Sequence, residues 1–313
     1  MSILHLSVAL DIYIGILAFV LGACMGSFLN CMAYRIAQGE SVLKGRSHCD
    51  TCGHVLSVRD LFPIVSFLIS KGKCRYCGAR LSAGHLVAEI ATGVTFVLII
   101  FTFDLSWTAL EMALFACVLL VAAFSDIKSY IIPNGCIIAG IIFRIPFFFL
   151  LPDWQACLID ALLGGFAVGG GLLLIVLIYE RVRKVEAMGG GDLKLLFVTG
   201  LYLGLAQNIL CVFIACILGI IFGLIFQHAS TQAPQDSGDS TAFGSTTPSL
   251  QVTKVVTSTT PAVTSSTHAS TTPAIDADTD MPKVFPWGPS ISAAAILCAL
   301  FGTPLISAYL ALF

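Results

Sequence analysis

The chain has 313 residues, of which 57% are hydrophobic and only 11% are charged, against roughly 25% charged residues in soluble domains. With a mean hydropathy of +0.95, this composition excludes an ordinary soluble protein, and we expect the lipid bilayer as a partner and no nucleic acid. A membrane-spanning helix needs about 20 apolar residues. On that criterion the sequence predicts an all-α polytopic membrane protein with about eight transmembrane helices.

The first predicted helix covers about residues 8–34, within an N-terminal segment 1–34. It lacks a basic n-region and an Ala-x-Ala-like cleavage site, which indicates a retained span and not a secretory signal. Residues 35–83 follow as a small insert that holds half of the 16 Lys and Arg residues. Because short loops rich in Lys and Arg stay in the cytoplasm, we expect this insert to face the cytoplasm.

The remaining apolar runs predict a transmembrane core over residues 84–228 and a last segment over 284–313. The expected spans are about 84–103, 108–126, 133–151, 157–180, 192–206, 207–227 and 289–313. The step at Gln207-Asn208 is the only marker between the sixth and seventh spans. Residues 229–283 are dominated by Ser, Thr, Ala and Pro and predict a disordered insert, because they hold too few apolar residues to form a core.

Four of the 12 cysteines form two Cys-x2-Cys pairs inside the basic insert, namely Cys49, Cys52, Cys74 and Cys77. Their spacing is close to that of a zinc ribbon, and four thiolates would close a tetrahedral site, so we expect a structural zinc ion. Redox dithiols or free thiols are the alternatives, and His48 and His54 are possible alternative ligands. The other eight cysteines lie in apolar segments and read as small core residues.

Two carboxylates stand at the ends of apolar runs. Asp126 closes the third predicted span, and Asp192 opens the sixth directly after three glycines. Alternation of the spans from the cytoplasmic insert places both at the cytoplasmic side. Such a pair shares a proton, so that one acid activates water while the other polarises a carbonyl. Asp126 alone also fits an interfacial residue at a helix end, and Asp192 alone fits the start of a helix, where the helix dipole favours a negative charge.

Further residues accompany this pair. Gly189 and Gly191 lack a Cβ and permit close approach of another segment. Lys194 either extends to the lipid headgroups or keeps the aspartate pocket electropositive. Glu89 lies inside the second span, where an acidic group should face the helix bundle or a cavity. Glu111 and Asp160 are expected towards the outer side, apart from the aspartate pair.

Taken in order, these motifs match those of a known family. The chain carries Gly26-Ser27-Phe28-Leu29-Asn30 with Tyr34-Arg35, the two Cys-x2-Cys pairs, Glu89, Ser125-Asp126 followed by Ile132-Pro133-Asn134, Gly189-Gly190-Gly191-Asp192-Leu193-Lys194-Leu195 and Phe285-Pro286-Trp287-Gly288-Pro289. It resembles the type IV prepilin peptidases, which are membrane aspartyl proteases of the Gly-x-Gly-Asp type, over nearly its full length.

The resemblance implies that Asp126 and Asp192 are the catalytic pair and cut the leader of prepilins or pseudopilins at the cytoplasmic face of the bacterial inner membrane. It also implies N-methylation of the new N-terminal residue with S-adenosylmethionine, for which Gly72 and Lys73 are the candidate residues. The residues themselves do not show this second activity, because the sequence has no glycine-rich nucleotide-binding unit. The 229–283 insert lies outside every motif and is expected to be dispensable for proteolysis.

Two other functions fit part of the pattern. A proton- or cation-coupled transporter also places carboxylates in pairs at helix breaks. It calls for neither a four-cysteine insert nor two carboxylates at one membrane face. A non-enzymatic scaffold anchored by its zinc module is the second alternative.

Overall fold

The computed structural model describes residues 7–42, 45–49, 51–150, 153–184, 188–231 and 286–311. The chain divides into two units, Met1–Gln227 with Val284–Phe313, and His228–Lys283. The fold described below is that of the first unit. The predicted disordered insert at 229–283 lies outside the described residues except for 229–231, which end a helix.

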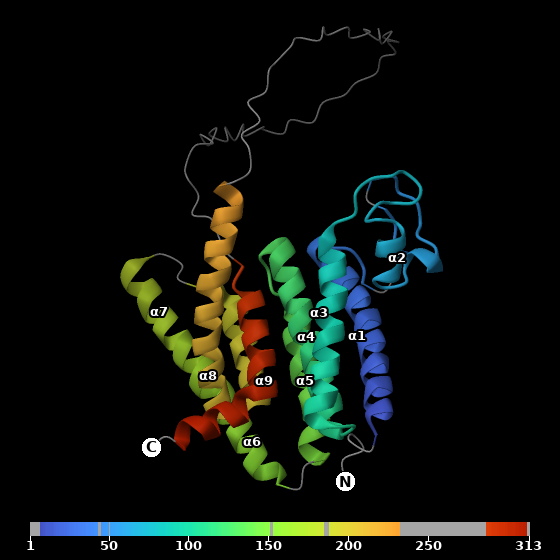
Figure 1. Ribbon diagram of the computed structural model, residues 1–313. Coiled ribbons are helices and arrows are strands. Elements are labelled where there is room, and N and C mark those ends of the chain that lie inside the picture. The colour runs from blue at the N-terminus through green and yellow to red at the C-terminus, as the bar shows by residue number, and fades with distance from the viewer. Residues whose placement is uncertain are drawn as a thin grey trace, which may run out of the picture. The chain divides into compact units, whose positions relative to one another are not determined.

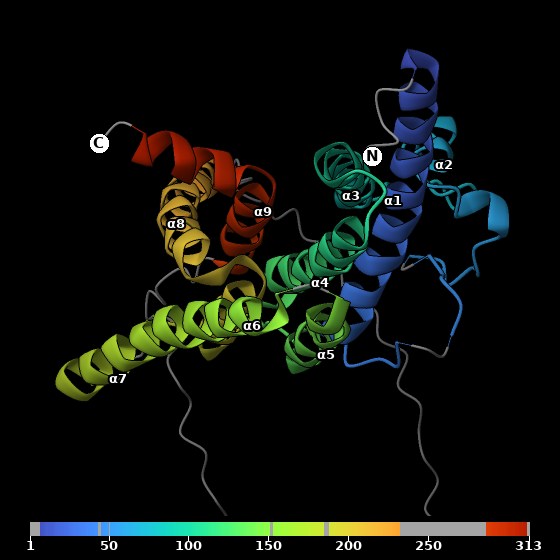
Figure 2. The same cartoon turned by 90° about the horizontal axis from the view of Figure 1, so that it is seen from below.

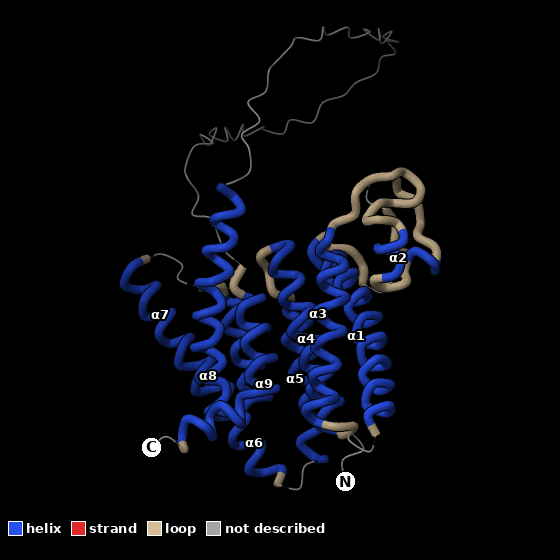
Figure 3. The backbone as a smooth tube through the Cα atoms, in the orientation of Figure 1, coloured by secondary structure: helices blue, strands red, loops and turns tan. Residues whose placement is uncertain are grey.

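Apart from turns and loops, the described residues form helices, and they contain no strand (Figures 1 and 3). The helices are α1 (Val8–Ala37), α2 (Val65–Ile69), α3 (Ala83–Phe103), α4 (Trp107–Ser129), α5 (Asn134–Leu150), α6 (Trp154–Leu163), α7 (Gly171–Arg183), α8 (Gly190–Thr231) and α9 (Gly288–Leu310), with a 3-10 turn η1 (Val58–Asp60) and a π-helical segment η2 (Gly164–Gly170). Two isolated β-bridges, His48 to Val55 and Lys73 to Arg80, close the two cysteine turns.

Six helical segments in the described ranges are long and apolar enough to cross a membrane, and α5 is a shorter apolar helix. One of the six, Trp154–Arg183, joins α6, η2 and α7, and it is longer than the predicted span at 157–180. With α5 included and the two limbs of α8 counted separately, the number of segments agrees with the eight predicted. The protein is therefore a multi-pass membrane protein.

Helix α8 folds back on itself at Gly204, which adopts φ 72° and ψ −177°. Asn208 Nδ2 donates to the carbonyl of Leu196 at 3.2 Å, although 12 residues would span about 18 Å along a straight helix. The chain therefore reverses at Gly204, and Asp160 Oδ1 accepts from the Leu205 N–H at 3.2 Å just after the turn. The predicted boundary at Gln207-Asn208 therefore lies a few residues after the observed turn. The turn occurs at Gly204 because glycine readily adopts this backbone conformation.

Helix α4 lies at the centre of this unit, between α1 and α3 on one side and α9 on the other (Figure 2). Phe115, Leu119 and Ala122 are almost fully buried in it. Glycine permits the closest contacts elsewhere: the backbones of Gly164 and Gly200 meet so closely that a Cβ on either would collide with the other. This contact holds η2 against the first limb of α8.

A buried ion pair joins α4 to α5 at the end of the helices away from Asp126. Arg144 Nη1 donates to Glu111 Oε1, and Arg144 Nε donates to the carbonyl of Leu201 at 3.0 Å. Both charged residues are at most 5% exposed, and the Arg144 guanidinium lies 5.4 Å from the Tyr202 ring. Glu111 is thus a buried residue at the end of α4 opposite Asp126, and it is apart from the aspartate pair as expected; its partner lies 33 positions later in the chain.

We expect Arg144→Met to destabilise the fold by about 3–5 kcal/mol, because it leaves the Glu111 carboxylate buried without its partner. The double variant Glu111→Leu/Arg144→Met removes both charges and should recover a large part of that loss. Thermal unfolding of the purified protein checks both. Equal loss in the single and double variants would contradict the pairing.

Candidate active site

Asp126 lies in the last turn of α4 and is only 5% exposed. The Tyr130 N–H donates to the Asp126 carbonyl at 2.9 Å, and Tyr130 takes φ 55°, which ends the helix in a left-handed cap. Ser125 Oγ then donates to the carbonyl of Ile131 at 3.1 Å and ties the loop to the helix. The position of the carboxylate is therefore set by a closed turn.

The Asp126 side chain is held by the first residue of α9. The Gly288 N–H donates to Asp126 Oδ2 at 2.8 Å, so the carboxylate meets the amino end of a 23-residue helix. That end of a helix favours negative charge. A Cβ at position 288 would lie 2.8 Å from Asp126 Oδ2, so the contact depends on glycine. The Gly288-Pro289 motif was noted in the sequence, but its partner could not be found there.

Asp192 lies in the first turn of α8. Its N–H donates to the carbonyl of Gly189 at 3.1 Å, and a Cβ at Gly189 would lie 3.2 Å from Asp192 Oδ2. A Cβ at Gly191 would lie 3.1 Å from Ile132 Cβ, so this glycine lets α8 pack against the loop after α4. The Asp192 carboxylate is half-buried and close enough to Asp126 to interact with it electrostatically.

The two aspartates thus lie at one end of the helices, where α4 ends and α8 and α9 begin, which we call the aspartate end. Lys194 is exposed there and donates to Asn134 Oδ1 at 2.9 Å, so it joins the start of α8 to the start of α5. In this structure Lys194 bonds to a neighbouring helix and not to the aspartates.

A polar cluster next to Asp126 joins α1, α3 and α4. Lys128 Nζ donates to Asn30 Oδ1 at 2.8 Å, and Asn30 Nδ2 lies 2.7 Å from His85 Nδ1. Asn30 is buried, and Lys128 lies 5.3 Å from the centre of the Tyr34 ring. His85 was not among the predicted site residues, because it belongs to none of the sequence motifs. The structure places it near the start of α3, where it is exposed.

Glu89 is buried in α3 and accepts a hydrogen bond from the Ile64 N–H at 2.7 Å. The donor belongs to the cysteine insert, so this carboxylate connects the insert to the helices. It does not reach the aspartate pair through any contact in the described part of the chain. Its expected direction, towards the protein interior, agrees with the structure.

The four cysteines of the insert come together. The Sγ atoms of Cys49, Cys52, Cys74 and Cys77 all lie within 4.8 Å of one another, and those of Cys49 and Cys77 are 3.9 Å apart. Sulfur atoms around a tetrahedral zinc ion, each about 2.3 Å from the metal, would be separated by about 3.8 Å. Hydrogen bonds from the backbone N–H groups of Cys52 and Thr51 lower the pKa of Cys49 to about 6. The donor set therefore fits a four-thiolate zinc site.

Gly72 and Lys73 lie on the turn between α2 and Cys74. Gly72 has φ 66°, donates to the Phe67 carbonyl at 2.9 Å and packs on the Phe67 ring, whereas Lys73 is exposed. The contacts of this turn do not define a nucleoside pocket.

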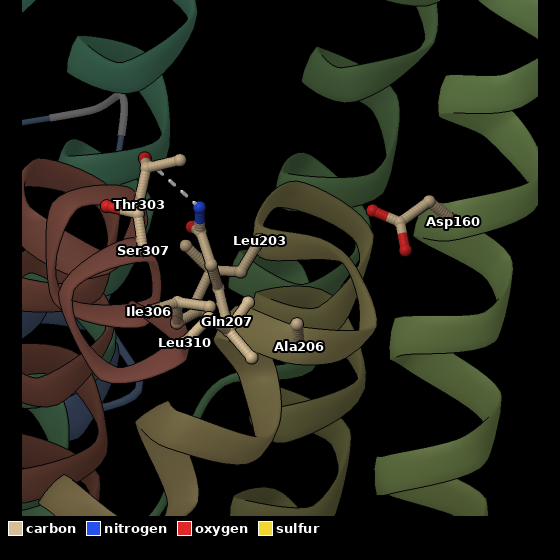
Figure 4. Close-up of a pocket in the computed structure, with 8 residues that line it drawn as sticks. All are labelled: Asp160, Leu203, Ala206, Gln207, Thr303, Ile306, Ser307 and Leu310. Atoms are coloured by element: carbon tan, nitrogen blue, oxygen red, sulfur yellow. Dashed lines mark hydrogen bonds between the residues drawn. The ribbon is translucent and has the colours of Figure 1, made fainter. Parts of the chain in front are cut away.

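A cavity of about 280 Å³ lies at the other end of the helices, between Asp160, the turn of α8 and the carboxyl end of α9 (Figure 4). Its polar groups include Gln207 Nε2, which donates to Thr303 Oγ1 at 3.4 Å. The first limb of α8 separates this turn from Asp192 by about 18 Å at 1.5 Å per residue. Asp160 therefore does not join the aspartate pair, as expected.

Comparison with known families agrees with these features. Residues 20–103 match the bacterial peptidase A24 N-terminal domain, and residues 113–224 match the type IV leader peptidase family. The chain belongs to the type IV leader peptidase family. The matched ranges include Glu89, all four insert cysteines and both aspartates. No solved structure gives a significant match.

Several members of the type IV leader peptidase family with the name prepilin leader peptidase/N-methyltransferase are similar to the chain. The Bacillus subtilis protein is 31% identical over 66% of this chain and 80% of its own length. The Myxococcus xanthus protein is 28% identical over 69% of this chain and 64% of its own length. The Neisseria gonorrhoeae protein is 26% identical over 68% of this chain and 82% of its own length.

Proposed function

We propose that this protein is an aspartyl endopeptidase that removes the leader of type IV prepilins or pseudopilins, with Asp126 and Asp192 as its catalytic pair. The observation that carries the proposal is that these two carboxylates lie at one end of the helices, close enough to interact electrostatically, with Asp126 bound to the Gly288 N–H. The family membership and the names of the relatives support the choice of substrate.

The proposed reaction needs no covalent intermediate. One aspartate, as the carboxylate, takes a proton from a water molecule while the water oxygen bonds to the scissile carbonyl carbon. The other aspartate, protonated, donates a hydrogen bond to the carbonyl oxygen and stabilises the tetrahedral intermediate. The C–N bond then breaks, and the departing amine takes up the proton that the first aspartate removed from water. The Gly288 N–H holds the Asp126 carboxylate in place during these steps.

We further propose that the protein methylates the new N-terminal amine of the pilin. The names of the relatives include N-methyltransferase, and S-adenosylmethionine would supply the methyl group. Gly72 and Lys73 remain the candidate residues, and no step of methyl transfer follows from their contacts.

The insert is proposed to be held together by one structural zinc ion on Cys49, Cys52, Cys74 and Cys77. A closed four-thiolate site leaves no position for a substrate, so the metal would stabilise the insert without entering the reaction.

We propose that the protein lies in the bacterial inner membrane with the aspartate end and the insert in the cytoplasm. The basic residues between Arg35 and Arg80 support this orientation. The proposed division of the chain is a first helix 1–34, the insert 35–83, a protease core 84–228, a polar insert 229–283 and a last helix 284–313. The family match does not favour the transporter alternative.

Co-production with a prepilin or pseudopilin tests both activities at once. The N-terminal mass of the product should correspond to cleavage before the hydrophobic helix of the pilin plus one methyl group. A pilin that is cut but not methylated would support only the peptidase activity, and an uncut pilin would contradict the proposed function.

A further inference from the structure

The cysteine insert exposes an apolar surface that its own fold does not cover. Between η1 and the end of α2, six large apolar side chains are each 43–72% exposed. We call them the α2 patch: Val58, Leu61, Phe62, Val65, Leu68 and Ile69. Six exposed large apolar side chains within 12 residues indicate an interaction surface, because exposure of these side chains to water is unfavourable.

The position of this segment along α3 follows from its hydrogen bond to that helix. Ile64, in the middle of the α2 patch, donates its N–H to Glu89 at 2.7 Å. Glu89 is six residues into α3, about 9 Å along the helix axis from Ala83. Helix α3 is an apolar span of 21 residues, which is about the length that crosses a bilayer. Ile64 is therefore held beside the first third of this helix, near the end that follows the insert.

The backbone at this contact is unusual and well fixed. Ile64 has φ 61°, a conformation that a β-branched residue rarely adopts. Glu89 is 8% exposed and provides a buried acceptor for its N–H. Phe67 turns to the other side of α2, where it packs under Gly72. The hydrogen bond and the Phe67 contact thus fix which side chains of α2 remain outside.

The charges around the α2 patch are predominantly positive. Exposed cations flank it in sequence, namely Arg59, Lys71, Lys73, Arg75 and Arg80. Asp60 is the single carboxylate between Val58 and Arg80, and it already pairs with Arg75 at 3.3 Å and accepts from Tyr76 Oη at 3.1 Å. Even with four thiolates around one divalent ion, residues 35–83 keep a net positive charge.

From these observations we propose that the α2 patch is an interfacial membrane anchor that docks into the surface of a bilayer containing acidic phospholipids. The apolar side chains enter the boundary between headgroups and acyl chains, and the cations contact lipid phosphates, as in other amphipathic interfacial segments. The Glu89 contact prevents the segment from leaving that depth. The insert is thereby kept on the membrane surface, next to the aspartate end of α1 and α3.

Photo-crosslinking to lipid tests the proposal in the full-length protein. p-Benzoylphenylalanine replaces Phe62, which is 59% exposed, and in separate variants Thr51 or Val94. Thr51 is an exposed residue of the first cysteine turn, outside the α2 patch and its neighbouring cations, and Val94 is a residue of the α3 span that is 45% exposed. Each variant is reconstituted in vesicles of phosphatidylcholine with a minority of phosphatidylglycerol.

We expect lipid adducts at position 62 at least about fivefold above those at position 51, with phosphatidylglycerol enriched over its share of the vesicle. Position 94 must give adducts as the positive control. In an Arg59→Gln/Lys71→Gln background the enrichment should fall at least about fivefold, the factor that corresponds to ~1 kcal/mol for a single cation near the membrane surface.

Lipid adducts at position 94 but none at position 62 would overturn the proposal. So would adducts at position 62 that form with a co-reconstituted prepilin in place of lipid, because the patch would then bind substrate. Neither result bears on the proposed peptidase activity, because the crosslinking measurement does not involve Asp126 or Asp192.

Discussion

Asp126→Asn and Asp192→Asn are each expected to reduce leader removal from a co-produced prepilin by about 10³-fold or more, within the usual contribution of general acid–base catalysis. An amide in place of either carboxylate can neither accept the proton of water nor hold the shared proton. The pair therefore fails as a unit, and the double variant should be no less active than either single one. Immunoblotting of precursor and mature pilin over time measures the loss.

Asp160→Asn is the matched control for this experiment. Asp160 is also an aspartate on a membrane helix, and its contact with the Leu205 N–H needs only an acceptor oxygen, which Asn keeps. We expect cleavage close to that of the parent protein. Full cleavage by either Asp126→Asn or Asp192→Asn, at normal protein levels, would remove that residue from the catalytic pair.

Loss of zinc is the second large effect that we expect. Cys49→Ser should reduce bound zinc from about one ion per chain to almost none, because three thiolates no longer close the site. Structural zinc contributes about 10–16 kcal/mol to the folding of small zinc domains, so the insert should unfold without the ion. Metal analysis and trypsin digestion at the insert lysines and arginines measure the two consequences.

Cys117→Ser is the control for the zinc experiment, since Cys117 is buried in α4 away from the insert. It should keep its zinc and an intact insert. Purified parent protein without zinc, or Cys49→Ser protein that retains it, would contradict the four-thiolate site. Chelation of the parent protein should reproduce the digestion pattern of Cys49→Ser.

Several features were predicted from the sequence because they depend on short stretches of chain. Apolar runs of span length locate helices wherever they fold, and only their ends shifted: the first helix runs to Ala37, a few residues beyond its predicted end. The Cys-x2-Cys spacing likewise places four sulfur atoms within reach of one metal. The catalytic role of Asp126 and Asp192 stays a prediction, although the structure brings them to the same end of the helices.

Other features could not be predicted, because their partners are far apart in the chain. The carboxylate of Asp126 meets the amide of Gly288, and Lys128 reaches Asn30 across 98 residues. The contact of the insert with α3 depends in the same way on Glu89, and the ion pair of Glu111 depends on Arg144. No periodicity in a single sequence reports such a pairing.

The amino-acid sequence by itself determined that this is a helical membrane protein with a four-cysteine insert and two acids at the ends of apolar runs, since composition and local spacing set these properties. The tertiary structure alone decided which groups surround those acids, where α8 turns back and which carboxylate holds the insert. The physical reason is that hydrogen bonds and close glycine contacts act over a few ångströms in space, and only the packed helices bring those distant positions together.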